Sequence, residues 1–389
     1  MRTRNKLIAR GILSAIVLVF LTMQITPGIY AQKTSVSTVY KVYYGQLHSH
    51  TWDSDGRIPT IDDPRTSGTP YKAYAYARDE AHLDFFSVAD HCSYPYGPNE
   101  SLTDDKYNSL METANTFNQD VQDDEEERFV TFWGFEWTSD DTSWGGPATL
   151  LGKGHITIIN SPNFCKATGE NTNDLNELVD WMSTRDCIAF FNHPGQYGYD
   201  FDKFLFNSSD KIVGMELWNR DDDYYDTNYY GNGSWNNALG KGWYIGASGS
   251  EDNHVDNWGT LTEWRMAVLA EEKTRESIYA AMKARRFYSC RDKDLELSFT
   301  CNRAQMGSQI AGGRLNVEIK ASDPDEIFSK IWLFKNGKKI KNWNPNITNP
   351  TVTTTVNGTK GDYFYVLVEQ AGEFKWAAIS SPIFINKYK

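Results

Sequence analysis

Short apolar runs that end in a metal-ligating type of residue recur along the chain from about residue 42 to residue 254. The runs end, in chain order, at His48-Ser49-His50, Asp90-His91, Glu136, His193 and Asp252-Asn253-His254. Such runs, rich in β-branched and aromatic residues, predict buried strands. Seven strands are counted from Val42 onward, most of them separated by helical stretches, and this alternation predicts a largely parallel α/β sheet or barrel.

Histidine is scarce, with seven in 389 residues, and its placement is selective. His48 and His50 are two residues apart on an extended segment, so both imidazoles should point to one side. Residues at the carboxyl ends of barrel strands meet at one face, where barrel enzymes place their chemistry. His155 instead opens an apolar run, and His82 lies within a helical stretch and is expected on the surface. Converging imidazoles and carboxylates predict a metal site.

The order of the motifs is more specific than any one of them. They are His48-x-His50 followed by Ser54-Asp55-Gly56, then Asp90-His91, Glu136, His155, His193-Pro194 and Asp252-x-His254. This ordered set resembles the PHP (polymerase and histidinol phosphatase) metallohydrolases over roughly residues 41 to 290. Trp218-Asn219 and the stretch from Arg275 to Arg286 look most like the secreted branch that includes carbamate-ester hydrolases. The resemblance implies a distorted seven-stranded (β/α) barrel, which the residues alone do not distinguish from an eight-stranded one.

The resemblance also implies three divalent metal ions and their ligands. The implied sets are His48, His50, Glu136 and Asp252 for the first ion, Glu136, His155 and His193 for the second, and Asp55, His91 and His254 for the third. Ligands rich in imidazole suit Zn, Fe or Mn better than Mg or Ca. Ions that share Glu136 would hold a bridging hydroxide and neutralise charge on a phosphoryl oxygen, so Glu136 and Asp252 are the expected catalytic residues.

These inferences predict a metal-dependent hydrolase, with a small-molecule phosphoester as the first expectation for its substrate. A carbamate or carboxylate ester at the same metals is the nearest alternative. A metal-stabilised glycan-binding protein without catalytic activity is an alternative from another class. The formal net charge of −12 argues against nucleic acid as a partner, because binding to its backbone needs clustered Lys and Arg.

The N-terminal 31 residues read as a cleavable signal peptide. Basic residues from Arg2 to Arg10 precede an apolar run over Gly11–Met23, and Ala31 offers a small residue for cleavage. The run is too short for a comfortable membrane span, so a secreted or periplasmic protein is expected. In such a compartment the five cysteines allow one or two disulfides.

Two domains are expected after this segment, a metallohydrolase barrel over residues 40–292 and a small β-sandwich over 295–389. Alternating apolar and polar residues with the turn signals Asn336-Gly337 and Asn357-Gly358 predict the sandwich. The sandwich has no recognisable catalytic group, and it is expected to serve as a structural cap or to contact glycans.

Helices are expected over 71–82, 106–121, 174–183 and 274–286. The segment from Asn219 to Gly242 has no clear period and is expected to be a long loop with at most one short helix. Its aromatic residues either line the substrate site or pack the loop onto the barrel.

Overall fold

The computed structural model describes residues 39–56, 68–92, 101–120, 122–139, 154–167, 171–194, 210–220, 222–223, 225, 233–372 and 376–386. The expected signal peptide, residues 1–31, lies outside these ranges and stays a prediction. Residues Val39 to Lys389 form one compact unit. In the described part of the chain no helix has the length and apolar character needed to cross a membrane.

The fold is mixed α/β, with one large sheet, a second smaller sheet and few helices. The first strands are β1 (Lys41–Gln46), β2 (Phe85–Val88), β3 (Val130–Ser139), β4 (Gly154–Ile159), β5 (Ile188–Phe191), β6 (Ile212–Asn219), β7 (Asp222–Asp223), β8 (Gly246–Ser250), β9 (Arg265–Ala270) and β10 (Phe287–Cys290). The helices are α1 (Pro70–Asp79), α2 (Asp104–Phe117), α3 (Leu175–Ser183), α4 (Ser234–Lys241) and α5 (Arg275–Lys283).

Strands β1 to β6 lie next to one another in chain order, and β8 joins at β6. The pairs β1–β2, β2–β3, β5–β6 and β6–β8 are parallel, whereas β4 is antiparallel to both β3 and β5. The reversal of β4 places His155, near its start, at the edge where the parallel strands end. An isolated parallel bridge between Ser49 and Asn253 links the segments that follow β1 and β8.

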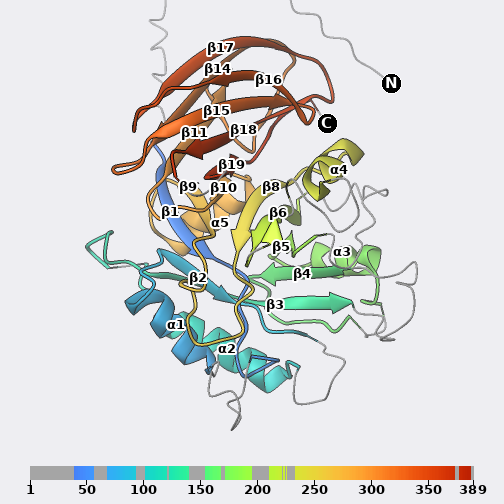
Figure 1. Ribbon diagram of the computed structural model, residues 1–389. Helices are drawn as coiled ribbons and strands as arrows, with labels where there is room; N and C mark the ends of the chain where they lie inside the picture. The colour runs from blue at the N-terminus through green and yellow to red at the C-terminus, as the bar shows by residue number, and fades with distance from the viewer. Residues whose placement is uncertain are drawn as a thin grey trace, which may run out of the picture. The chain divides into compact units, whose positions relative to one another are not determined.

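Four of the described helices begin at a capping side chain, of which only Asp174 was predicted. The side chains of Thr69, Thr103, Asp174 and Thr274 each accept a hydrogen bond from a backbone N–H in the first turn of α1, α2, α3 and α5, respectively. Helix α1 ends at Asp79, so His82 is exposed just beyond the helix, with φ of 51°. Helices α1 and α2 contact each other and cover the β2–β3 side of the sheet (Figure 1).

The last part of the chain is all β. Its strands are β11 (Glu296–Cys301), β12 (Ala304–Gln305), β13 (Gln309–Ile310), β14 (Gly313–Ser322), β15 (Phe328–Lys335), β16 (Lys338–Trp343), β17 (Thr351–Gly358), β18 (Tyr363–Gln370), β19 (Ala378–Ser380) and β20 (Ile383–Ile385). Strands β12, β11, β14 and β17 form the smaller sheet, while β19 pairs with β10 and so continues the large sheet into this region (Figure 1).

The two turn signals have different outcomes. Asn336 and Gly337 have φ of 51° and 73° and form the tight turn between β15 and β16, as predicted. The turn predicted at Asn357-Gly358 is wrong, because both residues belong to β17 and pair with Arg314 and Gly313 of β14.

All five cysteines lie among the described residues, and each is buried. None of them forms a disulfide, so the one or two bridges allowed by the sequence do not occur here.

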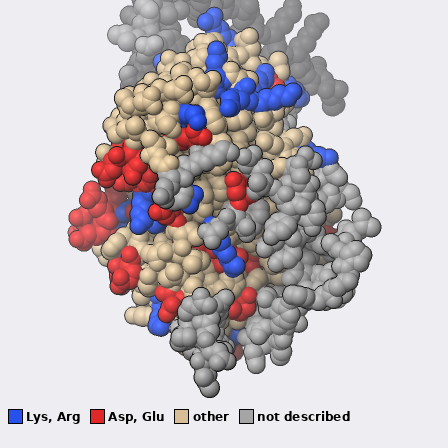
Figure 2. Space-filling model, viewed as in Figure 1, with Lys and Arg blue, Asp and Glu red and all other residues tan. Residues whose placement is uncertain are grey.

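On the face shown in Figure 2, Lys and Arg gather over the C-terminal strands. There β16 carries the exposed Lys338, Lys339 and Lys341 and pairs only with β15 among the described strands. Charge on such an edge discourages pairing with another chain.

Candidate metal centre

The structure brings all nine predicted ligand side chains into one buried cluster at the strand ends. This strand-end cluster consists of His48, His50, Asp55, His91, Glu136, His155, His193, Asp252 and His254. Their roles as ligands stay predictions, but their convergence is a geometric fact. It follows from the sheet, since β1, β2, β5 and β8 end at this edge and β4 begins there.

Backbone hydrogen bonds fix the segments that carry these side chains. The His50 N–H donates to the Asn253 carbonyl at 2.8 Å, and the Asp252 N–H donates to the His48 carbonyl at 3.1 Å. His91 forms an isolated parallel bridge with Glu136 of β3. The first and last motifs of the chain are therefore held side by side by main-chain atoms, independently of any ion.

At the centre of the cluster, Glu136 is fully buried and faces five imidazoles, one of them His50, whose Nε2 lies 3.4 Å from Oε2. Its carboxylate oxygens lie 3.2 Å from His48 Nε2, 2.9 Å from His91 Nδ1, 3.1 Å from His155 Nδ1 and 3.4 Å from His193 Nε2. Oε2 makes no well-aligned hydrogen bond within the described residues, although His91 Nδ1 lies 2.9 Å and His50 Nε2 3.4 Å from it. A buried carboxylate needs compensation of its charge, which protonated imidazoles or a bound metal ion would supply.

A second group forms around Asp252. His48 Nε2 and His50 Nε2 face each other at 3.2 Å, and Asp252 Oδ1 lies 3.2 Å and 2.9 Å from these two nitrogens. Two imidazole nitrogens and a carboxylate oxygen that point at one another make a natural set of ligands for Zn, Mn or Fe.

The third group lies nearer the mouth of the site. Asp55 Oδ2 is 3.1 Å from His254 Nε2 and 3.5 Å from His91 Nε2. The rings of His91 and His254 stack on His50 with centroids 4.5 Å and 4.2 Å away. The side chain of His254 is 20% exposed, compared with 1% for His48, so solvent or substrate reaches the cluster from this side.

Strong electrostatic coupling runs through the cluster. Burial opposes ionisation of Glu136, but His48, His91 and His155 hold the pKa of this carboxyl well below its usual range. Burial likewise opposes protonation of His48, yet Glu136, Asp252 and Glu216 hold its pKa well above the ordinary value. His50 behaves differently, because burial and the neighbouring His254 and His91 lower its pKa to about 3. Since metal-bound imidazoles must be neutral, metal binding here would release protons.

Three residues of the site have left-handed backbone conformations that side chains other than glycine rarely adopt. They are His193, Arg220 and Asp252, with φ of 26°, 51° and 47°. Such strain typically costs about 1–3 kcal/mol per residue and persists where the surrounding structure enforces it, often at functional sites.

Four residues support the cluster although the sequence did not predict a role for them. Asn192 Nδ2 donates to Glu136 Oε1 at 2.6 Å, and Glu216 Oε1 lies 2.8 Å from His48 Nδ1. Buried Asp90 accepts hydrogen bonds from Thr51 and Ser54 and so fixes the loop that carries Asp55. Arg220 pairs with Asp252 Oδ2 at 3.0 Å while its side chain is 46% exposed. Of these four residues, only Glu216 had a signal in the sequence that could have indicated a role, because it is an acid inside an otherwise apolar strand.

The loop from Asn219 to Gly242 is only partly described. Its described part contains the two-residue strand β7 and one short helix, α4, the latter as expected. Tyr225 and Trp235 are buried, and both rings contact Tyr365 of β18. These two aromatic residues pack the loop onto the C-terminal strands, while Tyr224, Tyr229 and Tyr230 lie outside the described residues.

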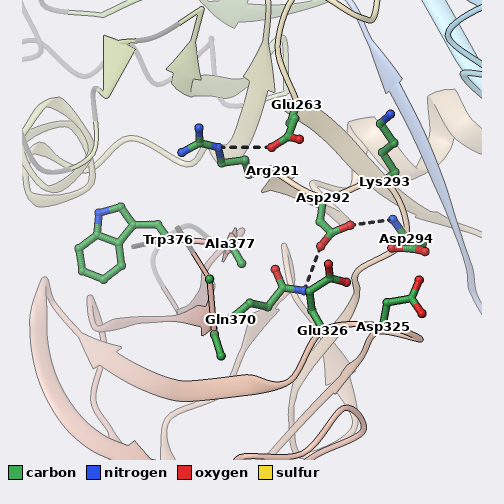
Figure 3. A pocket seen from close by; sticks show the side chains of 12 residues that line it. Glu263, Arg291, Asp292, Lys293, Asp294, Asp325, Glu326, Gln370, Trp376 and Ala377 are labelled. Atoms are coloured by element: carbon green, nitrogen blue, oxygen red, sulfur yellow. Dashed lines mark hydrogen bonds and ion pairs between the residues drawn. The ribbon is translucent and has the colours of Figure 1, made fainter. Parts of the chain in front are cut away.

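A second group of carboxylates lies where the turn after β10 meets the C-terminal strands, beside a cavity of about 450 Å³ (Figure 3). This acidic cluster consists of Asp292, Asp294, Asp323 and Glu326. Buried Asp323 accepts hydrogen bonds from the backbone N–H groups of Asp325 and Glu326, and Gln370 donates to both Asp323 and Asp292. The group is therefore held by the protein's own donors and contains no histidine.

Comparison with known proteins gives distant similarities. No protein-family model matches the chain. An uncharacterized protein of Chlamydia pneumoniae is 23% identical over 421 residues, which cover 92% of this chain and 62% of that protein. One of Chlamydia muridarum is 23% identical over 404 residues, covering 91% and 59%. The chain thus spans about three fifths of the length of the curated relatives it matches.

Among solved structures, similarity is found to a two-domain protein of Bacteroides vulgatus that contains a predicted PHP-like metal-dependent phosphoesterase. The two chains are 14% identical with a TM-score of 0.46, and the match covers 86% of this chain and 88% of the other.

Proposed function

We propose that the chain is a metal-dependent hydrolase of PHP type that cleaves a phosphoester of a small molecule. The observation that carries the proposal is the surrounding of buried Glu136 by five imidazoles at 2.9 to 3.4 Å. They belong to His48, His50, His91, His155 and His193. Each of these imidazoles can bind a metal ion when it is neutral. A carboxylate that faces so many of them is better explained as a ligand shared between ions than as one half of a structural ion pair.

The proposed ligand sets follow the sequence motifs. One ion would take His48, His50, Glu136 and Asp252, a second Glu136, His155 and His193, and a third Asp55, His91 and His254. Three observations support these sets: His48, His50 and Asp252 converge, Asp55, His91 and His254 converge together with His50, and both His155 and His193 face Glu136 Oε1. Divalent ions held there would activate a water molecule and offset the negative charge that develops on the substrate. The number of ions and their identity as Zn, Mn or Fe are part of the proposal.

The chain's own residues complete the site. Asn192 orients Glu136 through its amide, and the left-handed backbone of His193 and Asp252 directs these two side chains toward the cluster. Arg220 lies at the exposed side, where its guanidinium would attract a substrate with one anionic centre. Such a cation favours a phosphoester over a neutral ester.

We also propose that residues 40–292 form the barrel-like hydrolase domain and residues 295–389 a β-sandwich that supports it. The bridge between Ser49 and Asn253, which links the segments after β1 and β8, supports a closed ring of strands. A shared apolar core between the smaller sheet and strands β15 and β18 supports the sandwich. The described C-terminal residues give no support to glycan contact.

The test is metal analysis of the purified protein together with a hydrolysis panel of phosphomonoesters, phosphodiesters, carboxylate esters and carbamate esters. We expect bound Zn, Mn or Fe and a preference for phosphoesters. Asp323→Asn is the control, because Asp323 in the acidic cluster is as buried as Glu136. This variant should hydrolyse the panel at the parental rates. A preference for carboxylate or carbamate esters would overturn the substrate assignment, and metal-loaded protein without hydrolytic activity would overturn the function.

A further inference from the structure

A buried carboxylate stands directly behind the first ligand of the candidate centre. Glu216, on β6, is 2% exposed. Among the described residues no Lys or Arg forms an ion pair with it, and its recorded ion-pair partner is His48. Burying a charged carboxylate costs free energy unless hydrogen-bond donors compensate it, so its donors indicate what it does.

Both oxygens of Glu216 act as acceptors toward the centre. Oε1 lies 2.8 Å from Nδ1 of His48. Oε2 accepts the backbone N–H of His193 at 2.6 Å and the Nδ2 amide of Asn219 at 2.8 Å. One side chain therefore contacts two segments that carry proposed ligands, and these segments are far apart in the sequence.

The contact with His48 decides which ring nitrogen can bind a metal. A carboxylate oxygen accepts a hydrogen bond, so the proton of the imidazole belongs on Nδ1. Nε2 is then left with its lone pair, and this nitrogen lies 3.2 Å from both Glu136 Oε1 and Asp252 Oδ1. If the proton lay on Nε2 instead, His48 could not coordinate an ion at that place.

The contact with His193 acts on the backbone. His193 has φ of 26°, a conformation that needs support from its surroundings. The hydrogen bond from its N–H to Glu216 holds the peptide in that orientation and so aims the ring at Glu136, 3.4 Å from Nε2.

We propose that Glu216 is a positioning residue for the metal centre, which sets the Nδ1–H tautomer of His48 and the backbone of His193. The inference rests on the metal site of the proposed function. It assigns Glu216 no contact with substrate, because its two oxygens are occupied by His48, His193 and Asn219.

The experiment compares Glu216→Gln with the parent protein and with Asp323→Asn. The control removes the charge of another buried carboxylate that accepts two backbone N–H groups and one amide, away from the centre. Zinc affinity is measured by competition with a chelator. Ring-nitrogen NMR of the metal-free, histidine-labelled proteins, at a pH where the imidazoles are neutral, reports which ring nitrogen of each histidine carries the proton. With only seven histidines, the signals can be assigned by substitution.

We expect Glu216→Gln to bind zinc about tenfold to hundredfold more weakly, as is typical for loss of a residue that orients a ligand. The His48 signal should lose its Nδ1–H character, and Asp323→Asn should match the parent in both measurements. Glu216→Asp, which keeps the charge, provides the same test if the glutamine variant does not fold.

Parental zinc affinity and an unchanged His48 tautomer in Glu216→Gln would overturn the inference whatever the hydrolysis panel shows. A parent protein that binds zinc but cleaves none of the esters would overturn the proposed function and leave this test valid. A parent that binds none of Zn, Mn and Fe would overturn both.

Discussion

The strand-end cluster and the acidic cluster both crowd carboxylates, but their partners differ. In the strand-end cluster, Glu136 and Asp252 face imidazole nitrogens, which can bind a metal ion when they are neutral. In the acidic cluster, Asp323 and Asp292 accept hydrogen bonds from backbone N–H groups and from Gln370. The first arrangement offers nitrogen and oxygen atoms that could share a cation, whereas the two inner carboxylates of the second are hydrogen-bonded by protein donors.

The comparison teaches that a group of carboxylates does not by itself indicate a metal site. What separates the two regions is burial, the type of neighbouring donor and backbone strain. The strand-end cluster is largely buried and holds left-handed His193 and Asp252, while Asp294 and Glu326 of the acidic cluster are exposed. Four changes would break or sharpen this contrast.

The largest effect is expected for Glu136→Gln. The amide keeps the size of the side chain but removes its charge and half of its acceptor capacity. Hydrolysis should fall by well over the hundredfold that loss of an orienting residue costs, and metal content should fall with it. Rates, metal analysis and circular dichroism check this, with Asp323→Asn as the control. Near-parental turnover in fully metallated Glu136→Gln protein would remove the distinction between the clusters.

Metal removal should affect only the strand-end cluster. A ligand that binds the folded state alone stabilises it by about 4 kcal/mol at 1,000 times its dissociation constant. Chelation of Zn, Mn or Fe should therefore lower the unfolding temperature, and the loss should shrink in Glu136→Gln. Added calcium should leave the unfolding temperature unchanged, because the protein's own donors already occupy Asp323. A calcium-dependent rise that Asp292→Asn abolishes would make the acidic cluster a metal site after all.

A smaller effect is expected for Gln370→Ala. The substitution removes the amide that lies 2.6 Å from Asp323 Oδ2 and 2.9 Å from Asp292 Oδ2. Loss of a donor to a buried acceptor costs about 1–3 kcal/mol. Denaturant unfolding should show this cost with zinc affinity unchanged. Gln370→Glu should destabilise more, since it adds another carboxylate. Equal stability of all three proteins would show that the amide does not hold the cluster.

The smallest effect is a pH dependence. Burial and the neighbouring Asp292 raise the pKa of Asp294 to about 6, and a hydrogen bond with Asp323 together with burial raises the pKa of Glu326 to about 7. The folded state therefore holds these protons more tightly than the unfolded chain, and the stability they contribute is lost as the pH rises through about 6 to 7. Burial acts to raise the pKa of Asp292, but a hydrogen bond from Gln370 outweighs it and the pKa is lowered. The stability that Asp292 contributes is therefore lost as the pH falls, in a more acidic range.

The double variant Asp294→Asn/Glu326→Gln tests that pH dependence, because it removes both titrating groups. Its unfolding midpoint should fall less than the midpoint of the parent between about pH 5 and 8. The effect should be modest, because both side chains are exposed and solvent screens them. Parallel curves for the two proteins would show that the crowding of these carboxylates has no energetic consequence.

Local signals predicted that histidines and acids gather at the strand ends, whereas the set of nine residues was implied by the family resemblance. Alternation placed His48 and His50 on one side, and apolar runs located the strands before His91 and His193. The position of His155 at the start of a run is explained by the antiparallel direction of β4, which has no local signature. The capping residue Asp174 was also readable, since its side chain accepts from the Glu177 N–H.

Other features depend on contacts between distant segments. Strand β9 was not predicted, although it pairs with both β1 and β10, and the pairing of β10 with β19 joins the two expected domains in one sheet. No local pattern encodes which strand lies next to which. For the same reason the sequence did not predict that Glu216 supports His48, because their contact depends on how β6 lies relative to the segment after β1.

The bridge between Ser49 and Asn253 also sets the earliest time during synthesis at which the strand-end cluster can form. The segments it joins are about 200 residues apart, which at roughly 10 residues per second means that the second leaves the ribosome some 20 seconds after the first. Until then His48 and His50 lack Asp252 and the backbone that holds it. If the proposed function holds, capture of a full set of ions would be a late event, and metal supply in the compartment where folding finishes would decide how much protein becomes active.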